Sequence, residues 1–361
     1  MARIVLAGGG TGGHVYPAIA IGDELKRRGH DVLYYGDGNR LEARVAPERG
    51  YTFRPVEALQ YPRGGLLGKI RFAFGLLGAI WKARAPLKED AVDAVLGVGG
   101  YISAPPILAA WTLGRGTAIH EANVVPGMAN KLCARVADQI LLTYEKTRGR
   151  IPGSAPKTLV GVPINPVVLE GDRSAAAEKY VLDPSKPTVL FVGGSLGAER
   201  INELAIAVAR SDARSFQVVH LCGPRYHEAV SAELGEPPEG CTLRDYEDRM
   251  ADAYAIADLV VCRAGSSTLG ELCAVGKGSL LVPSPNVTEN HQEENARGLE
   301  EAGAAQVLVE HGWDLDGAVQ KVVDLMADTG TLEAMAEAAK GQARLDAASQ
   351  AADLVEKVLK G

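Results

Sequence analysis

The sequence predicts an α/β protein with two nucleotide-binding halves that face one cleft. Apolar, strand-like runs alternate with helical segments along the 361 residues, an order typical of parallel sheets covered by helices. A glycine-rich turn follows a buried strand at residues 8–13 and again at residues 193–198. Because each turn leads into a helix, whose first N–H groups attract anions, both halves are expected to bind phosphate groups.

Most of the expected strands are short runs of apolar, β-branched residues, as in strands buried on both faces. The residues from Ala18 to Arg28 predict a helix ended by Gly29, and the Ala-rich, charged tail at 332–359 predicts further helix. Prolines between 151 and 166 indicate the linker between the halves. The expected strands cover residues 2–7, 31–35, 94–98, 116–119, 139–142, 188–192, 216–221, 258–262 and 279–282.

Composition excludes some classes of protein. Hydrophobic residues make up 47% of the chain and charged residues 23%, as in soluble globular proteins. The net charge of −7 argues against a general nucleic-acid binder, which needs a basic face. The five cysteines form no Cys-x-x-Cys pair, which indicates reduced thiols and no structural zinc. A strand begins directly after Met1 and no apolar run is long enough to span a membrane, so we expect a cytoplasmic protein.

The first glycine turn permits a dinucleotide-binding alternative. Gly8, Gly10 and Gly13 satisfy the pattern G-x-G-x-x-G, and Asp37 follows the next strand, where a ribose-binding acid lies in dehydrogenases. This pattern is degenerate, and it leaves the second glycine turn unexplained.

The second half holds a denser group of polar residues. Gly265 and Ser266 follow the strand at 258–262, and their N–H groups and the hydroxyl can hold a diphosphate. Glu271 can accept hydrogen bonds from two ribose hydroxyls, and Gln292 can both donate to and accept from a sugar. The alternative for Glu271 is a capping box, because Thr268 stands three residues before it.

Five motifs in register resemble one family across nearly the whole chain. They are Gly9 to His14, Gly99-Gly100-Tyr101, His120 to Asn123, Gly193 to Ala198, and Arg263 to Glu271. In order and spacing they are similar to the bacterial UDP-N-acetylglucosamine:N-acetylmuramyl-(pentapeptide) pyrophosphoryl-undecaprenol N-acetylglucosamine transferases. The resemblance implies a GT-B fold of two Rossmann-like domains, 1–160 for the lipid-linked acceptor and membrane and 161–339 for the UDP-sugar. It also implies a last helix, from about residue 340 to 361, that packs back on the first domain.

The resemblance also implies roles for individual residues. Thr11, Gly12 and Gly13 would line the donor site, with contacts from Asn123 and Ser195. The backbone near Tyr246 and Glu247 would recognise the uracil, and Gln292 the N-acetylglucosamine. The diphosphate and ribose would lie against a run that contains Arg263, Ser266, Ser267, Thr268 and Glu271.

The chain departs from the family pattern at four positions. Asn165 stands where the family usually has an arginine, which removes a positive charge near the expected phosphates. The other departures are Ala122 in place of Gln, Gly270 in place of Ser, and His291 in place of Gln. They leave room for a relative with an altered donor or acceptor.

Two residues are candidates for the general base that deprotonates an acceptor hydroxyl. His14 closes the first glycine turn, and a histidine titrates near neutrality. Its alternative role is to cap a loop. Glu121 is the rival base, and its alternative role is to tie down its own loop. His120, His220 and His227 have no ligand-like spacing.

One segment carries charge opposite to that of the whole chain. Residues 61–88 hold six basic and no acidic residues, so the remainder carries −13 against the net −7. Ile70, Phe74, Leu77 and Trp81 fall on one stripe of a helix there. Such a stripe usually packs in a core. Flanking Lys69, Arg71, Lys82, Arg84 and Lys88 instead favour a helix that lies on the anionic inner membrane surface.

These observations predict an inverting glycosyltransferase that moves N-acetylglucosamine from UDP to the C4 hydroxyl of an undecaprenyl-diphosphate-linked muramyl peptide. No carboxylate cluster indicates a metal site, so we expect neither a metal nor another cofactor in the chemistry. Four alternatives remain. They are a UDP-N-acetylglucosamine 2-epimerase, another GT-B glycosyltransferase, a dinucleotide oxidoreductase and a sugar-nucleotide sensor without catalysis.

Overall fold

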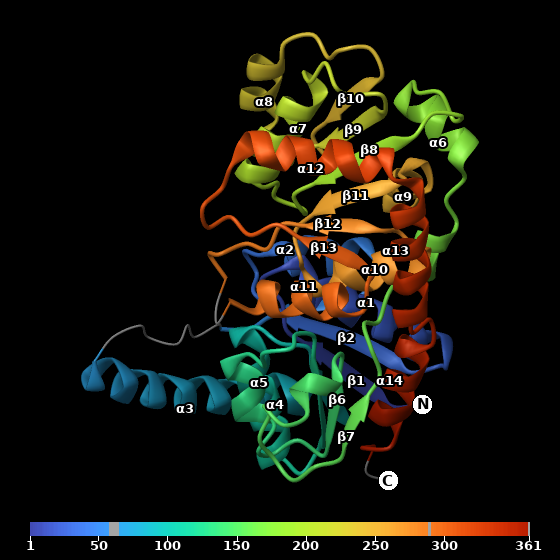
Figure 1. Ribbon diagram of the computed structural model, residues 1–361. Coiled ribbons are helices and arrows are strands. Elements are labelled where there is room, and N and C mark those ends of the chain that lie inside the picture. Colours follow the sequence, from blue (N-terminus) through green and yellow to red (C-terminus); the bar gives the residue numbers. More distant parts are fainter. Residues whose placement is uncertain (58–64, 288–289, 360–361) are drawn as a thin grey trace. The chain divides into compact units, whose positions relative to one another are not determined.

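The computed structural model describes residues 1–57, 65–287 and 290–359, and leaves aside the side chains of residues 66, 67, 69 and 70. The chain divides into two compact units (Figure 1). The N-terminal unit comprises Met1–Asn165 together with Arg344–Gly361, and the C-terminal unit comprises Pro166–Ala343. The break therefore falls within the proline-containing segment that the sequence indicated as a linker, after Asn165.

Within its described residues, the N-terminal unit has one seven-stranded sheet with the order β3-β2-β1-β4-β5-β6-β7. All its pairings are parallel. The strands are β1 (Arg3–Ala7), β2 (Asp31–Gly36), β3 (Thr52–Pro55), β4 (Ala94–Gly97), β5 (Gly116–Glu121), β6 (Gln139–Leu142) and β7 (Lys157–Leu159). The helices are α1 (Gly12–Arg27), α2 (Leu41–Glu48), α3 (Leu66–Glu89), α4 (Ala104–Thr112) and α5 (Met128–Cys133), with 3₁₀ turns η1 (Tyr101–Ser103) and η2 (Glu145–Thr147).

The C-terminal unit has a six-stranded parallel sheet with the order β10-β9-β8-β11-β12-β13, again within the described residues. The strands are β8 (Thr188–Val192), β9 (Gln217–Leu221), β10 (Cys241–Arg244), β11 (Leu259–Cys262), β12 (Ser279–Leu281) and β13 (Ala305–Val307). The helices are α6 (Arg173–Tyr180), α7 (Glu199–Ala209), α8 (His227–Leu234), α9 (Met250–Ile256), α10 (Ser266–Val275), α11 (His291–Glu301), α12 (Leu315–Ala327) and α13 (Thr329–Gln342), after a 3₁₀ turn η3 (Pro166–Leu169).

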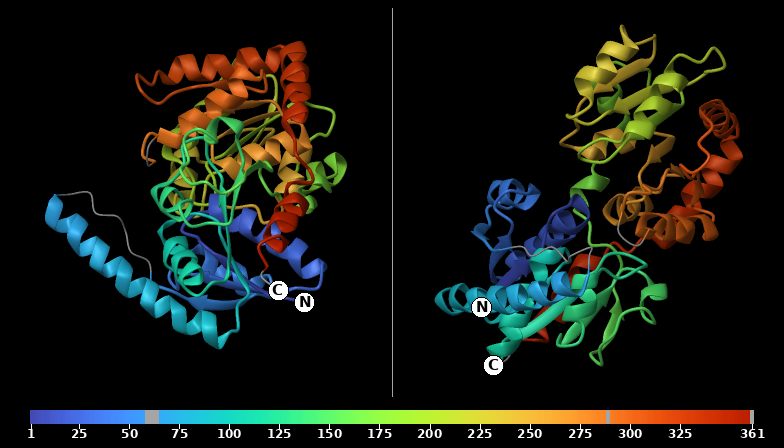
Figure 2. Two further views of the ribbon diagram at one scale, coloured as in Figure 1. Left: turned by 90° about the horizontal axis from the view of Figure 1, so that it is seen from below. Right: turned by 90° about the vertical axis from the view of Figure 1, so that its left-hand side faces the viewer.

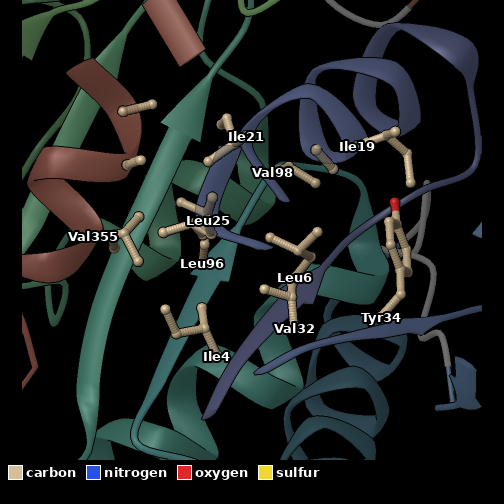
Figure 3. Close-up of a cluster of buried hydrophobic side chains, with 14 of the residues drawn as sticks. Ile4, Leu6, Ile19, Ile21, Leu25, Val32, Tyr34, Leu96, Val98 and Val355 are labelled. Atoms are coloured by element: carbon tan, nitrogen blue, oxygen red, sulfur yellow. The ribbon is translucent and has the colours of Figure 1, made fainter. Parts of the chain in front are cut away.

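The last helix, α14 (Ala347–Glu356), packs in the N-terminal unit. Val355 lies in the same buried cluster as Ile4, Leu25 and Leu96 (Figure 3). The polar side of α14 is held by Arg28, the residue after α1. Arg28 donates to Asp353 at 2.5 Å and to Glu356 at 2.9 Å. The helical tail expected at 332–359 is interrupted at Ala343, where the chain passes from one unit to the other.

The register of the strands sets which turns are neighbours. In the N-terminal unit, Ala7 at the end of β1 pairs with Tyr35 of β2 and with Gly97 of β4. In the C-terminal unit, Cys262 at the end of β11 pairs with Val192 of β8 and with Leu281 of β12. Because parallel strands end at the same edge of a sheet, the glycine-rich turns after these strands gather at the carboxyl edge of each unit.

Helix α1 begins earlier than the sequence indicated. The sequence predicts a start at Ala18, but the helix begins at Gly12 and includes Pro17, with Val15 N–H donating to the Thr11 carbonyl at 3.1 Å. A proline removes one N–H donor, and the buried side of α1 outweighs that loss.

Helix α3 extends away from the rest of the N-terminal unit (Figure 2). Its later half packs on α4, where Arg84 donates to the Thr112 hydroxyl at 2.6 Å. Within the described residues, no helix is both long and apolar enough to span a membrane.

Candidate functional site

The first glycine turn places His14 at the start of α1. Thr11 is the residue before the helix, and its Oγ1 atom lies 3.1 Å from His14 Nδ1. The imidazole also lies against Gly99, the residue that follows β4 by two positions. A Cβ atom on Gly99 would come within 2.6 Å of His14 Cδ2, and the φ of Gly99 is +98°, so only glycine fits there. Contacts on two sides thus hold a ring that remains partly exposed.

Glu121 is fully engaged with its own loop. It lies buried at the end of β5, and its Oε1 accepts from the backbone N–H of Asn123 at 3.0 Å. Its Oε2 accepts from Gly127 N–H at 3.0 Å and from Asn130 Nδ2 at 2.9 Å. Burial raises the pKa of this carboxyl group, and the hydrogen bonds act in the opposite direction. These contacts favour the alternative role, in which Glu121 ties down the loop that carries Asn123.

His120 lies directly behind this loop and is fully buried. Its Nε2 atom lies 3.3 Å from the Gly161 carbonyl and 3.2 Å from the Thr143 hydroxyl. Burial lowers its pKa to about 4, so the ring is neutral at physiological pH. His220 in the C-terminal unit is similar, with a pKa of about 4 because of burial. Neither ring is placed for acid–base chemistry with a substrate.

In the C-terminal unit, α10 begins with two serine hydroxyls. Ser266 and Ser267 are its first residues, and no side chain caps the helix. Within the described residues, neither hydroxyl has a hydrogen-bond partner, although both oxygens are buried. A buried hydroxyl without a partner costs free energy, and the first N–H groups of a helix attract anions. Gly265 adds open space before the helix, since nothing lies within 4 Å of where its Cβ would be.

Glu271 lies further along the same helix and is hydrogen-bonded to Tyr254. The Tyr254 hydroxyl donates to Glu271 Oε2 at 2.8 Å. Burial raises the pKa of Glu271 to about 7, against the opposing effect of this hydrogen bond. The capping-box alternative is wrong, because Gly265 rather than Thr268 precedes the helix and Thr268 is its third residue.

Gln292 is the second residue of α11, and Ser195 lies in the loop between β8 and α7. Gln292 Oε1 accepts from the Ser284 N–H at 2.9 Å and so holds the segment after β12. Ser195 lies half-buried in the second glycine turn, which closes with Gly197 N–H donating to the Gly194 carbonyl at 3.0 Å. A Cβ on Gly197 would approach the Cys222 carbonyl to 2.1 Å, so this turn is packed tightly on the loop after β9.

Two predicted binding residues already have protein partners. Arg263 forms an ion pair with Glu310 and donates to the Val282 carbonyl at 3.0 Å. The Glu247 carboxylate accepts from Lys179 at 2.8 Å and from Tyr180 at 2.6 Å. Burial alone would raise the pKa of Glu247, but these hydrogen bonds outweigh it and the pKa is lowered. The carboxylate of Glu247 is therefore held by contacts within the protein.

The apolar stripe of α3 is exposed over most of its length. The exposed fractions are 71% for Phe74, 62% for Leu77 and 75% for Trp81, which excludes core packing for these three. The side chain of Ile70 lies outside the described residues. Arg84 contacts the Trp81 ring at 5.4 Å, and Lys82 pairs with Glu57 at 2.8 Å. Trp111 of α4 is also exposed.

The structure thus brings the candidates together in two groups, one at the carboxyl edge of each sheet. Thr11, Gly12, Gly13 and His14 follow β1, and in the same unit Glu121 ends β5 and Asn123 follows it. Ser195 follows β8, Ser266 to Glu271 follow β11, and Gln292 follows β12. Within the part of the chain that is described, no group of three or more His, Cys, Asp or Glu side chains is placed to hold a metal ion.

Sequence reasoning missed two carboxylate contacts. Glu42 in α2 accepts from the first glycine turn, and Tyr254 in α9 donates to Glu271. A glutamate in the first turn of a helix is usually explained by the helix dipole alone. A tyrosine within a run of alanines is usually explained by packing. Both contacts join segments distant in sequence, so no local pattern indicated them.

Two parallel sheets with glycine-rich turns at their carboxyl edges have the architecture of the GT-B fold. The glycosyltransferase family 28 N-terminal domain matches residues 4–142, and the glycosyltransferase family 28 C-terminal domain matches residues 188–354. The chain belongs to this family and is an enzyme that transfers a sugar.

Two relatives carry the name UDP-N-acetylglucosamine--N-acetylmuramyl-(pentapeptide) pyrophosphoryl-undecaprenol N-acetylglucosamine transferase. The one from Halalkalibacterium halodurans is 35% identical over 99% of this chain and 100% of the relative. The one from Salinibacter ruber is 39% identical over 96% of this chain and 94% of the relative. The crystal structure of Acinetobacter baumannii MurG is 31% identical, with a TM-score of 0.78 over 99% of this chain and 100% of that one.

Proposed function

We propose that this chain transfers N-acetylglucosamine from UDP-N-acetylglucosamine to the C4 hydroxyl of undecaprenyl-diphosphate-linked N-acetylmuramyl-pentapeptide, a step of peptidoglycan synthesis. Membership of family 28 and the names of the relatives support this choice of donor and acceptor. The observation that carries it is the start of α10, where two hydroxyls that have no hydrogen-bond partner among the described residues precede a carboxylate on one helix. That order of groups matches a diphosphate followed by a ribose.

The donor is bound by the C-terminal unit in this proposal. Ser266, Ser267 and the first N–H groups of α10 hold the diphosphate. Glu271 accepts from the ribose hydroxyls, while Tyr254 keeps one of its oxygens in place. Gln292 can donate to the sugar through Nε2, while its Oε1 accepts from the Ser284 N–H. The backbone at Glu247 recognises the uracil. Arg263, held by Glu310, fixes the segment after β12 through the Val282 carbonyl.

The reaction is a displacement at C1 of the sugar with inversion. His14 removes the proton from the acceptor C4 hydroxyl as the oxygen forms a bond to C1 on the face opposite UDP. The bond from C1 to the diphosphate oxygen breaks, and UDP leaves with the electron pair. N–H groups at the start of α10 and in the glycine turns stabilise the charge that develops on it. His14 then releases the proton to solvent.

His14 is favoured over Glu121 as the base. Its ring is partly exposed and oriented by Thr11, while both oxygens of Glu121 accept hydrogen bonds inside its own loop. A base must reach the proton that it removes, and that requirement selects the exposed group. Glu121 then acts by holding Asn123 beside the substrate.

The N-terminal unit binds the lipid-linked acceptor and docks on the membrane in this proposal. Phe74, Leu77 and Trp81 insert into the interface, and Arg71 and Lys88, both exposed, face anionic head groups. The protein is then a peripheral protein on the cytoplasmic face of the cell membrane. The acceptor is anchored in the same membrane by its undecaprenyl chain.

Replacing Glu271 with alanine should weaken binding of UDP-N-acetylglucosamine by about 1.5 to 3 kcal/mol, the effect of losing hydrogen bonds to a charged group. Titration calorimetry measures this directly. Asp258→Asn is the matched control, because Asp258 accepts from the Thr188 N–H at 2.8 Å at the opposite edge of the same sheet. A Glu271 variant that binds the donor as well as Asp258→Asn does would contradict the ribose contact.

Binding of the donor should strengthen about tenfold between pH 6 and pH 8. The pKa of Glu271 is about 7, and only its ionised form accepts from both ribose hydroxyls, so its charged fraction rises about tenfold over this range. UDP-N-acetylglucosamine suits the titration because its diphosphate is esterified at both ends and does not titrate near neutrality. The Glu271→Gln variant should lose the pH dependence. If donor affinity changes with pH equally in the wild type and in Glu271→Gln, the pH dependence comes from another group.

A further inference from the structure

Glu42 is a fully buried carboxylate that no step above uses. It stands in the first turn of α2, and its Oε2 accepts from the Gly10 N–H at 2.9 Å. Its Oε1 accepts from the Asp37 N–H at 3.1 Å, just beyond the end of β2. One side chain therefore joins the first glycine turn to the next strand of the sheet. A buried charge is retained only where its hydrogen bonds are made, so this contact is specific.

Two glycines make room for this carboxylate. A Cβ atom on Gly9 would lie 2.1 Å from both Cδ and Oε1 of Glu42, and one on Gly36 would lie 2.5 Å from its Cγ. Contacts below 3 Å with a buried side chain force a rearrangement. The glycine at position 9 is thus required by a side chain of the protein itself, independently of any ligand.

The opposite side of the turn is closed by the loop after β4. The Gly9 N–H donates to the Gly99 carbonyl at 3.4 Å, and a Cβ on Gly100 would come within 2.6 Å of the Gly9 carbonyl. The Gly8 N–H donates to the Tyr35 carbonyl at 3.2 Å. The N–H groups of Gly8, Gly9 and Gly10 all point to acceptors within the protein, so this part of the turn is not a cradle for a dinucleotide pyrophosphate.

We propose that Glu42 is a positioning residue for the transfer reaction. It acts as an internal anion that fixes the backbone at Gly9 and Gly10, one residue before Thr11, whose hydroxyl orients His14. The turn is held between Glu42 on one side and Gly99 and Gly100 on the other, and His14 lies against Gly99. Loss of the carboxylate frees one side of the turn and moves the imidazole. This inference rests on the proposed role of His14 as the base.

The test is the Glu42→Gln variant, which keeps the shape of the side chain. An amide offers one oxygen, so its NH₂ group must face either Gly10 N–H or Asp37 N–H, donor against donor. We expect kcat to fall roughly 10- to 100-fold, the effect of a displacement of about 1 Å in a catalytic group. The KM and the dissociation constant for UDP-N-acetylglucosamine should change much less than kcat, because the proposed contacts to the diphosphate, the ribose and the sugar come from the other unit.

Asp93→Asn is the matched control. Asp93 accepts from the Arg3 N–H at 2.8 Å at the opposite edge of the same sheet, so it is a carboxylate anchor distant from the turn. The melting temperature of each variant is measured first. The kcat of each is then assayed with folded protein, well below that temperature. A purely structural Glu42 would lower the melting temperature as Asp93→Asn does and leave kcat of the folded enzyme unchanged, which would overturn the proposal. A rise in donor KM with kcat unchanged would overturn it as well.

His14→Ala belongs in the same assay because it separates the proposal that His14 is the base from the proposal that Glu42 positions it. If His14→Ala is inactive and Glu42→Gln has wild-type kcat, the positioning role is wrong and the base stands. If His14→Ala keeps wild-type kcat, the assignment of His14 as the base is wrong. The proposal that Glu42 acts by positioning His14 is then wrong as well. Loss of kcat in both variants, with donor binding intact, supports the positioning role.

Discussion

Replacing His14 with alanine should lower kcat by about 10² to 10⁴-fold, the usual contribution of a general base. The affinity for UDP-N-acetylglucosamine should change little, since this interaction is made in the transition state rather than with the bound donor. The ring is partly exposed and contacts Thr11 and Gly99. The buried residues of α1, rather than His14, stabilise this helix. Steady-state kinetics with both substrates at saturation measures the effect.

His227→Ala is the control for this variant, because His227 is an exposed histidine at the start of α8 in the C-terminal unit. It should have wild-type kcat. Near wild-type turnover by His14→Ala would contradict the assignment and pass the role of base to Glu121. In that case Glu121→Gln should lose turnover. Its melting temperature should stay at the wild-type value, which would show that the protein is still folded.

Replacing Phe74, Leu77 and Trp81 together with serine should abolish binding to anionic vesicles. Each side chain contributes about 1.5 to 3 kcal/mol when fully inserted, and each nearby lysine or arginine about 1 kcal/mol. The rest of the chain is acidic and is repelled by the same surface, so docking must come from α3. Sedimentation with vesicles at low and high salt measures it, and binding of the wild type should fall as salt screens the charges.

The variant should keep its melting temperature and its affinity for UDP-N-acetylglucosamine, because the three side chains are exposed. A Val167→Ser, Leu169→Ser variant removes exposed apolar side chains from the C-terminal unit and should sediment as the wild type does. Equal sedimentation of the α3 variant and the wild type would show that this stripe does not dock on lipid.

The central strands were predictable from sequence, and the edge strands were not. β1, β4, β8 and β11 are buried on both faces and appear as unbroken apolar runs. β3 and β7 lie at the two edges of the N-terminal sheet, have only three or four residues and are only partly buried. Hydrogen bonds to a neighbouring strand define them, so the residues alone do not. β7 lies between the two proline-containing stretches, 151–156 and 160–166, that indicate the linker.

The site was predictable where its chemistry lies in contiguous residues. The glycine turns and the run from Ser266 to Glu271 sit where a strand gives way to a helix, as their sequence indicated. The capping box failed because the helix starts at Ser266, two residues before Thr268, and a motif does not show where a helix begins. The contacts from Glu42 to Gly10 and from Arg263 to Glu310 join distant segments, and only folding brings them together.

The most direct test of the account is product analysis with purified protein, UDP-N-acetylglucosamine and undecaprenyl-diphosphate-linked N-acetylmuramyl-pentapeptide. The account predicts equal amounts of UDP and of a lipid-linked disaccharide, with the new bond to C4 in the β configuration and no product when the acceptor is omitted. Conversion of the donor to its 2-epimer without acceptor, or retention of the α configuration in the product, would contradict it.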